Sequence, residues 1–341
     1  MNLIIRLSMK KLLVILFCLP MIGFGQLCDS LLLQSITNPG PFSVNSFNES
    51  TGIRNGLDYA GATIYYPINS TSSILSSIVM VPGFMNTELT IQNWGPFLAS
   101  HGIITMTIGT NLLNDSHIER RDALLDAVVS LKNENQRQLS PLFGKIDTNS
   151  IAVGGFSKGG GGAQLVPSVD STIKSVISLY PWLENPTSSD LNHSTPVMII
   201  SGQLDAIAPP SIHADVHYNL TPNSTNKLKY EIAFASHDAI SGPYAGGGEV
   251  GIKVISWLQT FLLEDSCYCP IVVLNAASSS SYITNVDCSS INVNTLQFDS
   301  SSHKRILKIV DLLGRETKEK KNTPLFYIYD DGTVEKRITI E

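Results

Sequence analysis

The sequence contains a serine whose immediate neighbours suit nucleophilic chemistry. Ser157 is the centre of a Gly-x-Ser-x-Gly pattern that begins at Gly155 and ends at Gly159. In this pattern the serine lies on a sharp turn between a strand and a helix, so that its hydroxyl projects from the sheet. The two glycines leave room for backbone that a Cβ would obstruct. The pattern therefore predicts a nucleophile for acyl transfer at Ser157.

A serine hydroxyl is a weak nucleophile unless a base accepts its proton and a carboxylate orients that base. Asp205 comes a few residues after the apolar run 197–200, and His237 comes just after the strand-like run 229–234. Proteins with this serine turn carry the acid and then the histidine on loops after later strands. The chain order therefore predicts that Ser157, Asp205 and His237 meet at one edge of a sheet.

Other acids and histidines later in the chain fit this role less well. One pair, Asp190 and His193, precedes a predicted strand instead of following one. A helix predicted over 209–220 carries three more, which we expect to face solvent: His213, Asp215 and His217.

Attack on a carbonyl creates a negative oxygen that needs two fixed hydrogen-bond donors. One donor is the backbone N–H of Lys158, the residue after the predicted nucleophile. The second is expected on the loop after the apolar run 78–81, and we assign it to the backbone N–H of Phe84. Loss of one such donor typically costs about 3 kcal/mol of transition-state stabilisation.

These residues need a framework that brings the ends of distant strands together. Continuous apolar runs predict strands that are buried on both faces. They occur at 78–81, 103–108, 151–154, 176–179 and 197–200. Amphipathic segments such as 117–136 predict helices between them. This alternation predicts an α/β domain over 26–265, with a mostly parallel central sheet and helices on both faces.

The composition excludes some classes of partner. The chain has 341 residues, a net charge of −6 and no basic patch before its C-terminal tail, so we expect no nucleic-acid partner. The glycine run 159–162 is not a phosphate-binding loop, because Lys158 precedes the glycines instead of following them. We expect a monomer with one large domain and small appendages.

The first 25 residues have the features of a signal peptide. A positive region with Arg6, Lys10 and Lys11 precedes an apolar segment from 12 to 21, which is too short to span a membrane. We expect cleavage ahead of Gln26, no membrane span in the mature chain, and an extracellular or cell-surface location.

Export would place the remaining cysteines in an oxidising compartment, where cysteines pair as disulfides. Four remain once Cys18 leaves with the signal peptide: Cys28, Cys267, Cys269 and Cys288. Four cysteines allow three pairings. Because Cys267 and Cys269 are separated by one residue, we expect each of them to pair with one of the other two. No histidine lies near this group in the sequence, which disfavours a zinc site.

The composition changes after residue 265. Serine runs at 278–281 and 300–302 indicate exposed turns, so we expect a disulfide-linked, serine-rich linker over 266–302. From His303 the chain becomes basic and strand-like, which predicts a small β domain over 303–341.

Five blocks of the sequence resemble bacterial cutinases and polyester hydrolases that degrade poly(ethylene terephthalate). The blocks lie at 81–84, 155–162, 180–182, 205–209 and 236–237, and the resemblance covers roughly residues 40–270. These proteins are lidless α/β-hydrolases and relatives of the dienelactone hydrolases. The resemblance implies that this chain has the same lidless α/β-hydrolase fold.

The resemblance also assigns roles to single residues. It implies Ser157 as nucleophile, His237 as base and Asp205 as its partner. It implies no metal or organic cofactor, with calcium as a stabiliser only. Residues expected to contact the substrate are Phe84, Phe156, Trp182 and Ile207. The rings of Phe84 and Trp182 would lie opposite each other and pack on an acyl or terephthalate ring.

Two positions depart from the family. Its members usually have Trp or His before the nucleophile and Met or Gln after it, whereas this chain has Phe156 and Lys158. Lys158 places a charge near the floor of the cleft, which disfavours an apolar polymer or shifts the working pH. The departure leaves ester hydrolysis itself intact.

The C-terminal tail carries a second resemblance. Residues 309–316 and 327–338 look like a type A sorting domain of the Por (type nine) secretion system. That implies secretion machinery as a partner, often with removal of the tail. The alternative is a small β appendage that packs on the catalytic domain.

The sequence therefore predicts a secreted serine hydrolase that cleaves carboxylic esters through an acyl-enzyme. By resemblance its substrates are cutin-like or aromatic polyesters such as poly(ethylene terephthalate). One alternative is a small-ester or lipid esterase without polymer activity. Another, of a different class, is a surface-binding module with an inactive hydrolase core.

Overall fold

The computed structural model describes residues 36, 39–48, 56–237, 242–289, 306–311, 314–318, 320–329 and 334–337. The chain divides into two units, residues 1–293 and 294–341, which are described separately. The signal peptide expected over 1–25 and Cys28 lie outside the described residues.

The first unit is built on one nine-stranded sheet with the order β1-β2-β4-β3-β5-β6-β7-β8-β9. Its strands are β1 Val44–Asn48, β2 Ala62–Pro67, β3 Leu75–Val81, β4 Ile104–Ile108, β5 Ile146–Phe156, β6 Ser175–Leu179, β7 Val197–Gly202, β8 Lys227–Ile232 and β9 Ser279–Thr284. The six strands from β4 to β8 in this order pair in parallel, and the three outer strands pair antiparallel. The predicted mostly parallel sheet is confirmed.

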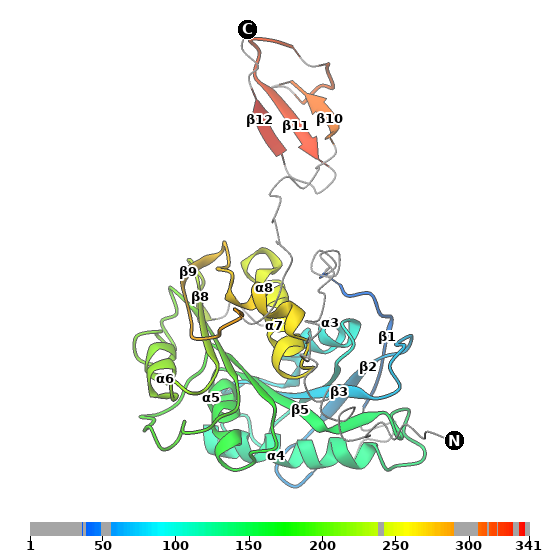
Figure 1. The fold of residues 1–341 in the computed structure, drawn as a ribbon, viewed down its shortest axis with the longest axis vertical. Coiled ribbons are helices and arrows are strands. Elements are labelled where there is room, and N and C mark those ends of the chain that lie inside the picture. The colour runs from blue at the N-terminus through cyan, green and yellow to red at the C-terminus, as the bar shows by residue number, and fades with distance from the viewer. Residues whose placement is uncertain are drawn as a thin grey trace, which may run out of the picture. The chain divides into compact units, whose positions relative to one another are not determined.

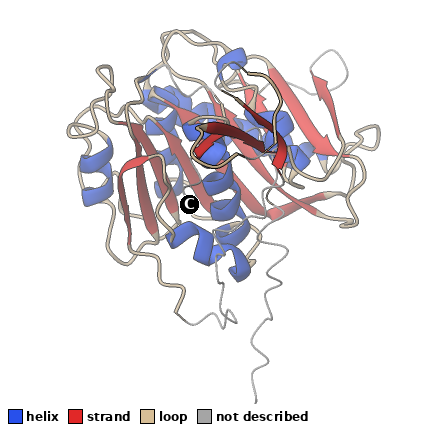
Figure 2. Ribbon diagram, turned by 90° about the horizontal axis from the view of Figure 1, so that it is seen from above, coloured by secondary structure: helices blue, strands red, loops and turns tan. Residues whose placement is uncertain are grey.

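Helices cover both faces of this sheet (Figures 1 and 2). They are α3 Trp94–Ser100, α4 His117–Glu134, α5 Lys158–Leu165, α6 Ala214–Leu220, α7 Glu249–Phe261 and α8 Cys269–Val273. Short 3₁₀ turns occur at η2 Glu88–Thr90, η3 Val166–Ser168, η5 Gly246–Gly248 and η6 Ser266–Tyr268. The architecture is that of an α/β-hydrolase, as predicted.

The central strands are rich in apolar residues and buried on both faces because they supply two cores. Along β3, Val79 and Val81 join the cluster that contains α4, whereas Ile78 and Met80 join the cluster that contains α3 and α7. Successive side chains of a strand point to opposite faces, so a strand with helices on both sides has no polar face to display.

The N-terminal ends of α4 and α6 are set in different ways. A capping box fixes the start of α4, where the Ser116 hydroxyl accepts from the Glu119 N–H and the Glu119 carboxylate accepts from the Ser116 N–H. The helix predicted over 209–220 begins only at Ala214, because residues 209–213 form turns.

Part of the disulfide-linked, serine-rich extension or linker that we expected over 266–302 belongs to the main sheet, and residues 290–302 lie outside the described residues. Residues 279–284 form β9, which pairs antiparallel with β8 and belongs to the main sheet. Tyr282 anchors the strand, since its ring packs on Tyr230 and its hydroxyl donates to the Val272 carbonyl. Serine gives no strong strand signal, so this edge strand depends on its partner and not on local propensity.

A disulfide closes this region. Cys269 at the start of α8 is bonded to Cys288, which follows β9. This is one of the pairings that the sequence allowed. Cys267 is also disulfide-bonded.

The second unit contains a three-stranded antiparallel sheet with the order β10-β11-β12. Its strands are β10 Ile306–Val310, β11 Leu325–Tyr329 and β12 Val334–Arg337. Leu325 and Tyr327 are buried and pack against Ile309. The prediction of a small C-terminal β element is confirmed.

The parallel pairing of the first unit explains how distant residues meet. β3, β5, β7 and β8 all run in the same direction, so their C-terminal ends lie along one edge of the sheet (Figure 1). The loops that leave these four strands carry the residues singled out by sequence.

Candidate active site

Ser157 occupies a strained turn between β5 and α5. Its backbone has φ 55° and ψ −120°, a region that residues with a Cβ rarely adopt. Two hydrogen bonds hold the turn: the Ser157 N–H donates to the Leu179 carbonyl at 2.8 Å, and the Trp182 N–H donates to the Ser157 carbonyl at 2.9 Å. The strain is thus balanced by contacts to the end of β6 and the residues after it.

The glycines around this turn are required for space. A Cβ on Gly155 would lie 2.4 Å from the carbonyl carbon of Gly159, and a Cβ on Gly159 would lie 2.4 Å from the Pro82 oxygen. The next three glycines of α5 also meet backbone atoms at less than 3 Å. Four consecutive glycines have a low intrinsic propensity to form a helix. The stability of α5 therefore comes from its tight packing and not from the propensity of its residues.

The structure brings Ser157, His237 and Asp205 into one hydrogen-bonded chain. His237 Nδ1 lies 2.7 Å from Asp205 Oδ2, and His237 Nε2 lies 3.0 Å from Ser157 Oγ. All three side chains are buried. Asp205 follows β7 and His237 follows β8, so each comes from the strand end that the sequence indicated.

The carboxylate of Asp205 is fixed by more than the histidine. Its Oδ1 accepts hydrogen bonds from the backbone N–H groups of Ile207 at 2.9 Å and Ala208 at 2.7 Å. With Oδ1 held in this way, Oδ2 faces Nδ1 and favours the imidazole tautomer with a proton on Nδ1. Nε2 then carries a lone pair that accepts the proton of the Ser157 hydroxyl.

Two aromatic rings support the imidazole of His237. The Phe156 ring lies 5.0 Å from it between centroids, and the Tyr180 ring lies 5.9 Å from it nearly at right angles. Burial and the nearby Asp205 carboxylate raise the pKa of Tyr180 well above its usual range, so its hydroxyl stays neutral. These contacts restrict rotation of the imidazole.

The position of Phe156 corrects an expectation from sequence. We expected it to contact substrate, but its side chain is only 5% exposed and belongs to the core cluster that contains α3 and α7. It lies against His237 and Tyr180, so it positions the histidine instead of lining the rim.

The loop that follows β3 brings Phe84 beside the serine. A Cβ on Gly83 would lie 2.8 Å from the Ser157 Cβ, which shows how closely the two segments approach. Within the described residues no group accepts a hydrogen bond from the Phe84 N–H. The Lys158 N–H begins α5 and so has no acceptor within the helix. Both amides are available as oxyanion donors.

A buried arginine that the sequence analysis missed holds this loop. The Arg120 guanidinium donates to the Pro82 carbonyl at 3.2 Å and to the Leu113 carbonyl at 2.9 Å. Burial lowers its pKa to about 10, which leaves it charged at neutral pH. The helical pattern over 117–136 marks Arg120 only as one charged residue among several, so no local pattern indicated that its side chain is buried.

The outer wall of the site is formed by three side chains, Lys158, Phe84 and Trp182. The Lys158 ammonium lies 4.4 Å from the centroid of the Phe84 ring and 4.6 Å from that of Trp182. Phe84 is 45% exposed and Ile207 is 62% exposed, so both are accessible to a ligand. The Lys158 ammonium thus lies over both of the rings that we expected to pack on substrate, and their contact with substrate stays a prediction.

Two histidines that we expected to face solvent are buried behind this wall. The His213 ring packs on Trp182 at a centroid distance of 5.7 Å, and Gln164 Nε2 donates to His217 Nδ1 at 3.2 Å. Burial lowers the pKa of His217 to about 3, so the imidazole is neutral. Their four-residue spacing puts both on one helix face, which is the signal that could have indicated burial. The third residue, Asp215, is partly exposed and pairs with Lys229.

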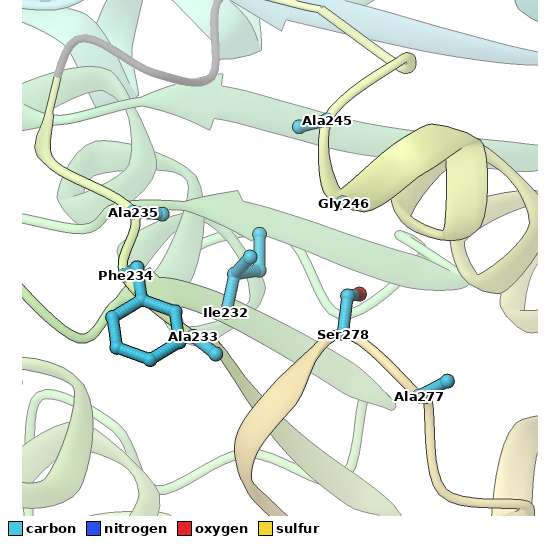
Figure 3. Close-up of a pocket in the computed structure, with 8 residues that line it drawn as sticks. All are labelled: Ile232, Ala233, Phe234, Ala235, Ala245, Gly246, Ala277 and Ser278. Atoms are coloured by element: carbon cyan, nitrogen blue, oxygen red, sulfur yellow. The ribbon is translucent and has the colours of Figure 1, made fainter. Parts of the chain in front are cut away.

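A separate hollow of about 440 Å³ lies near the same edge of the sheet. Figure 3 shows it between the end of β8, the turn at Ala245 and Gly246, and the residues before β9. Its lining is mostly alanine with Ile232 and Phe234, and it contains no titratable side chain. It therefore offers volume and apolar contact but no acid–base chemistry.

Among the described residues, no three His, Cys, Asp or Glu side chains gather as they would around a metal ion. No helix in the described part of the chain combines the length and apolar character that crossing a bilayer requires.

Residues 32–290 match the family model described as PET hydrolase-like. Cutinase from Thermobifida fusca is 34% identical over 240 residues, which are 70% of this chain and 75% of that cutinase. Cutinase est1 from Thermobifida alba is 34% identical over 233 residues, 67% of this chain and 73% of est1.

A third relative is named for a smaller ester. The bis(hydroxyethyl) terephthalate hydrolase of Streptomyces coelicolor is 32% identical over 236 residues, 68% of this chain and 72% of that enzyme. The family match spans the whole sheet together with Ser157, Asp205 and His237. This chain therefore belongs to the PET hydrolase-like family and is a carboxylic ester hydrolase.

Proposed function

We propose that Ser157, His237 and Asp205 are the catalytic triad of this enzyme and that it works through an acyl-enzyme. The observation that carries the proposal is the hydrogen-bonded chain from Asp205 Oδ2 through the imidazole to Ser157 Oγ, on a turn with a strained serine backbone. An intact chain of this kind argues against a binding module with an inactive core.

The reaction follows from the positions of the protons. His237 Nε2 takes the proton of the Ser157 hydroxyl while Oγ attacks the ester carbonyl, and the N–H groups of Phe84 and Lys158 hold the negative oxygen. The protonated imidazole, stabilised by Asp205, gives its proton to the leaving alcohol. Water then attacks the acyl-enzyme with His237 again as base, which releases the acid.

We propose polyesters, cutin-like or aromatic, as substrates. Support comes from the names of the relatives and from the apolar side chains of Phe84 and Ile207, which are exposed on the loops that leave β3 and β7. One observation favours a second candidate, an esterase for small soluble esters. The Lys158 ammonium lies between the rings of Phe84 and Trp182, where an apolar polymer segment would otherwise pack.

We also propose that the enzyme is exported and that residues 303–341 act as a sorting tail. The Cys269–Cys288 disulfide supports an oxidising compartment. The separate three-stranded sheet supports an appendage that contributes nothing to catalysis. Deletion of residues 294–341 should abolish release into the medium of the native host while the purified enzyme keeps its esterase activity. Normal release of the deletion variant would contradict the sorting role.

One experiment tests the catalytic proposal. The wild type should react with a fluorophosphonate probe and hydrolyse a soluble p-nitrophenyl ester, whereas Ser157→Ala should do neither. Incubation with polyester film then separates the two substrate candidates. Soluble aromatic acids released by the wild type only would favour the polyester hydrolase, and soluble-ester activity without release would favour the small-ester enzyme.

A further inference from the structure

The side chain next to the nucleophile carries a charge that the rest of the mechanism does not use. Lys158 follows Ser157 directly, and its ammonium lies between the faces of two aromatic rings, Phe84 and Trp182. Each ring lies within the distance at which a cation is attracted to an aromatic face. The two contacts hold the ammonium at the outer wall of the site instead of letting it extend freely into solvent.

Among the residues that the structure describes, this ammonium has no negative partner. Among the described residues, no carboxylate forms an ion pair with Lys158 and no acceptor takes a hydrogen bond from its Nζ. Glu184 is close enough to act with Lys158 on the pKa of His117, but it is not paired with the lysine. Aromatic faces attract a cation without neutralising it, so the ammonium keeps its full charge and its hydrogen-bonding capacity.

The location defines what such a charge can recognise. The backbone N–H of Lys158 is one of the two proposed oxyanion donors. When this N–H binds the carbonyl oxygen of an ester, the acyl group attached to that carbonyl lies beside Lys158. The faces of Phe84 and Trp182 hold the ammonium in place, and the ammonium offers N–H donors to the far end of that acyl group. A carboxylate is the group that satisfies a lysine in a partly dehydrated site most strongly.

We propose that Lys158, Phe84 and Trp182 form a carboxylate-binding subsite for the acyl part of the substrate. The preferred substrates are monoesters of dicarboxylic acids, in which a free carboxylate lies at the end of the acyl chain opposite the ester. This inference rests on the proposed catalytic triad and deepens it by naming the substrate class.

Such substrates arise from the enzyme's own class of reaction. Hydrolysis of one internal ester in a polyester of a diacid and a diol consumes one water and leaves one carboxylate end and one hydroxyl end. The subsite therefore directs the enzyme to chains and fragments that end in a carboxylate, instead of to the interior of an intact neutral polymer. A lysine at this position favours the later steps of polyester breakdown.

Matched pairs of soluble esters test the proposal. One pair is the p-nitrophenyl monoester of adipic acid and the p-nitrophenyl ester of hexanoic acid, which have the same chain length and differ in the terminal carboxylate. A second pair is mono(2-hydroxyethyl) terephthalate and 2-hydroxyethyl 4-methylbenzoate, which test an aromatic spacer. The quantity measured for each pair is the ratio of kcat/KM for the anionic ester to that for the neutral ester.

Lys158→Met should lower this ratio about tenfold, because a hydrogen bond to a charged group is lost. Lys158→Arg should retain most of it. Lys174→Met is the matched control, since this exposed lysine lies before β6 at the opposite edge of the sheet and its loss changes net charge equally. It should leave the ratio unchanged. In the wild type, 0.5 M NaCl should lower the ratio as well, because salt screens the exposed charge.

The outcomes separate this inference from the proposed function. If the neutral esters are hydrolysed in a Ser157-dependent way but the ratio is the same in the wild type and Lys158→Met, the carboxylate subsite is wrong and the triad stands. A ratio that does not respond to salt in the wild type also overturns the subsite, even if Lys158→Met fails to fold. If the wild type hydrolyses no member of either pair, the proposed function itself is wrong.

Discussion

Two regions near the C-terminal end of β8 show why volume alone does not make a site. The hollow in Figure 3 includes Phe234 and Ala235, and the chain reaches His237 only two residues later. The hollow offers about 440 Å³ and apolar walls, whereas the edge at Ser157 is crowded and its polar side chains are buried. Of the two regions, only the crowded edge holds a carboxylate, an imidazole and a hydroxyl at hydrogen-bond distances.

The difference has a physical cause. A proton passes between a hydroxyl and an imidazole only when the two atoms stay near 3 Å apart, and close packing is what maintains such a distance. The glycines of α5, the aromatic rings beside His237 and the backbone donors to Asp205 all serve this purpose. The hollow has no comparable constraint, so changes there and changes at the edge should have very different effects.

The largest expected effect on activity comes from a change at the carboxylate of Asp205. Asp205→Asn keeps the size of the side chain but no longer stabilises a protonated His237, and it favours the wrong imidazole tautomer. We expect kcat for a p-nitrophenyl ester to fall about 10⁴-fold with little change in the melting temperature. A loss of less than tenfold would mean that Asp205 is not the partner of the base.

The crowding itself can be tested at a glycine. Gly155→Ala places a Cβ against the backbone of Gly159, so we expect a loss of about 1 to 3 kcal/mol in the free energy of unfolding. Urea denaturation measures it. Gly144→Ala is the control, because Gly144 has φ 67° but no atom within 4 Å of a new Cβ. Its cost of about 1 kcal/mol comes from backbone conformation alone, and a larger loss at Gly144 than at Gly155 would contradict the role of crowding.

Buried polar groups behind the edge should make the protein sensitive to acid. The pKa of His217 is lowered to about 3 in the folded state, so between pH 6.5 and 3 the unfolded chain binds more protons and stability falls as the pH falls. Between pH 7 and pH 5.5 this histidine should account for about 1 kcal/mol of lost stability.

His217→Gln tests this contribution. Glutamine keeps an acceptor for Gln164 but does not titrate. The difference between the free energies of unfolding at pH 7 and pH 5.5, from urea denaturation, should be about 1 kcal/mol smaller in the variant than in the wild type. Equal pH dependence in the two proteins would show that His217 is not responsible.

The smallest effect is expected in the hollow. Ala277→Leu adds three carbons to an exposed side chain on its lining, and the space to hold them is present. We expect kcat/KM for a soluble ester to stay within a factor of two and the free energy of unfolding to change by about 0.5 kcal/mol or less. A tenfold loss of activity would show that the hollow takes part in the site, and the contrast between the two regions would fail.

Much of the framework was predictable because it depends on local patterns. Continuous apolar runs indicated the buried strands, and the glycine–serine pattern indicated the turn after β5. The order of Ser157, Asp205 and His237 along the chain placed each at the end of a parallel strand, and the structure brings the three within hydrogen-bond distance. Their catalytic roles stay predictions until the variants are measured.

Sequence patterns failed where a residue's surroundings come from distant parts of the chain. The serine run at 278–281 looked like a turn, yet residues 279–284 form a strand because β8 offers an unpaired edge. Phe156 looked like a substrate contact, yet it is buried against His237. His213 was expected in solvent, yet Trp182 covers it.

By itself the sequence determined the α/β-hydrolase framework and the strand ends that carry Ser157, Asp205 and His237, because the period of apolar residues and the needs of a tight turn act over a few residues. Only the tertiary structure decided that Cys269 bonds to Cys288, and that the Lys158 ammonium lies between two rings. Those outcomes depend on which surfaces meet when the helices pack on the sheet, and no short stretch of sequence records that.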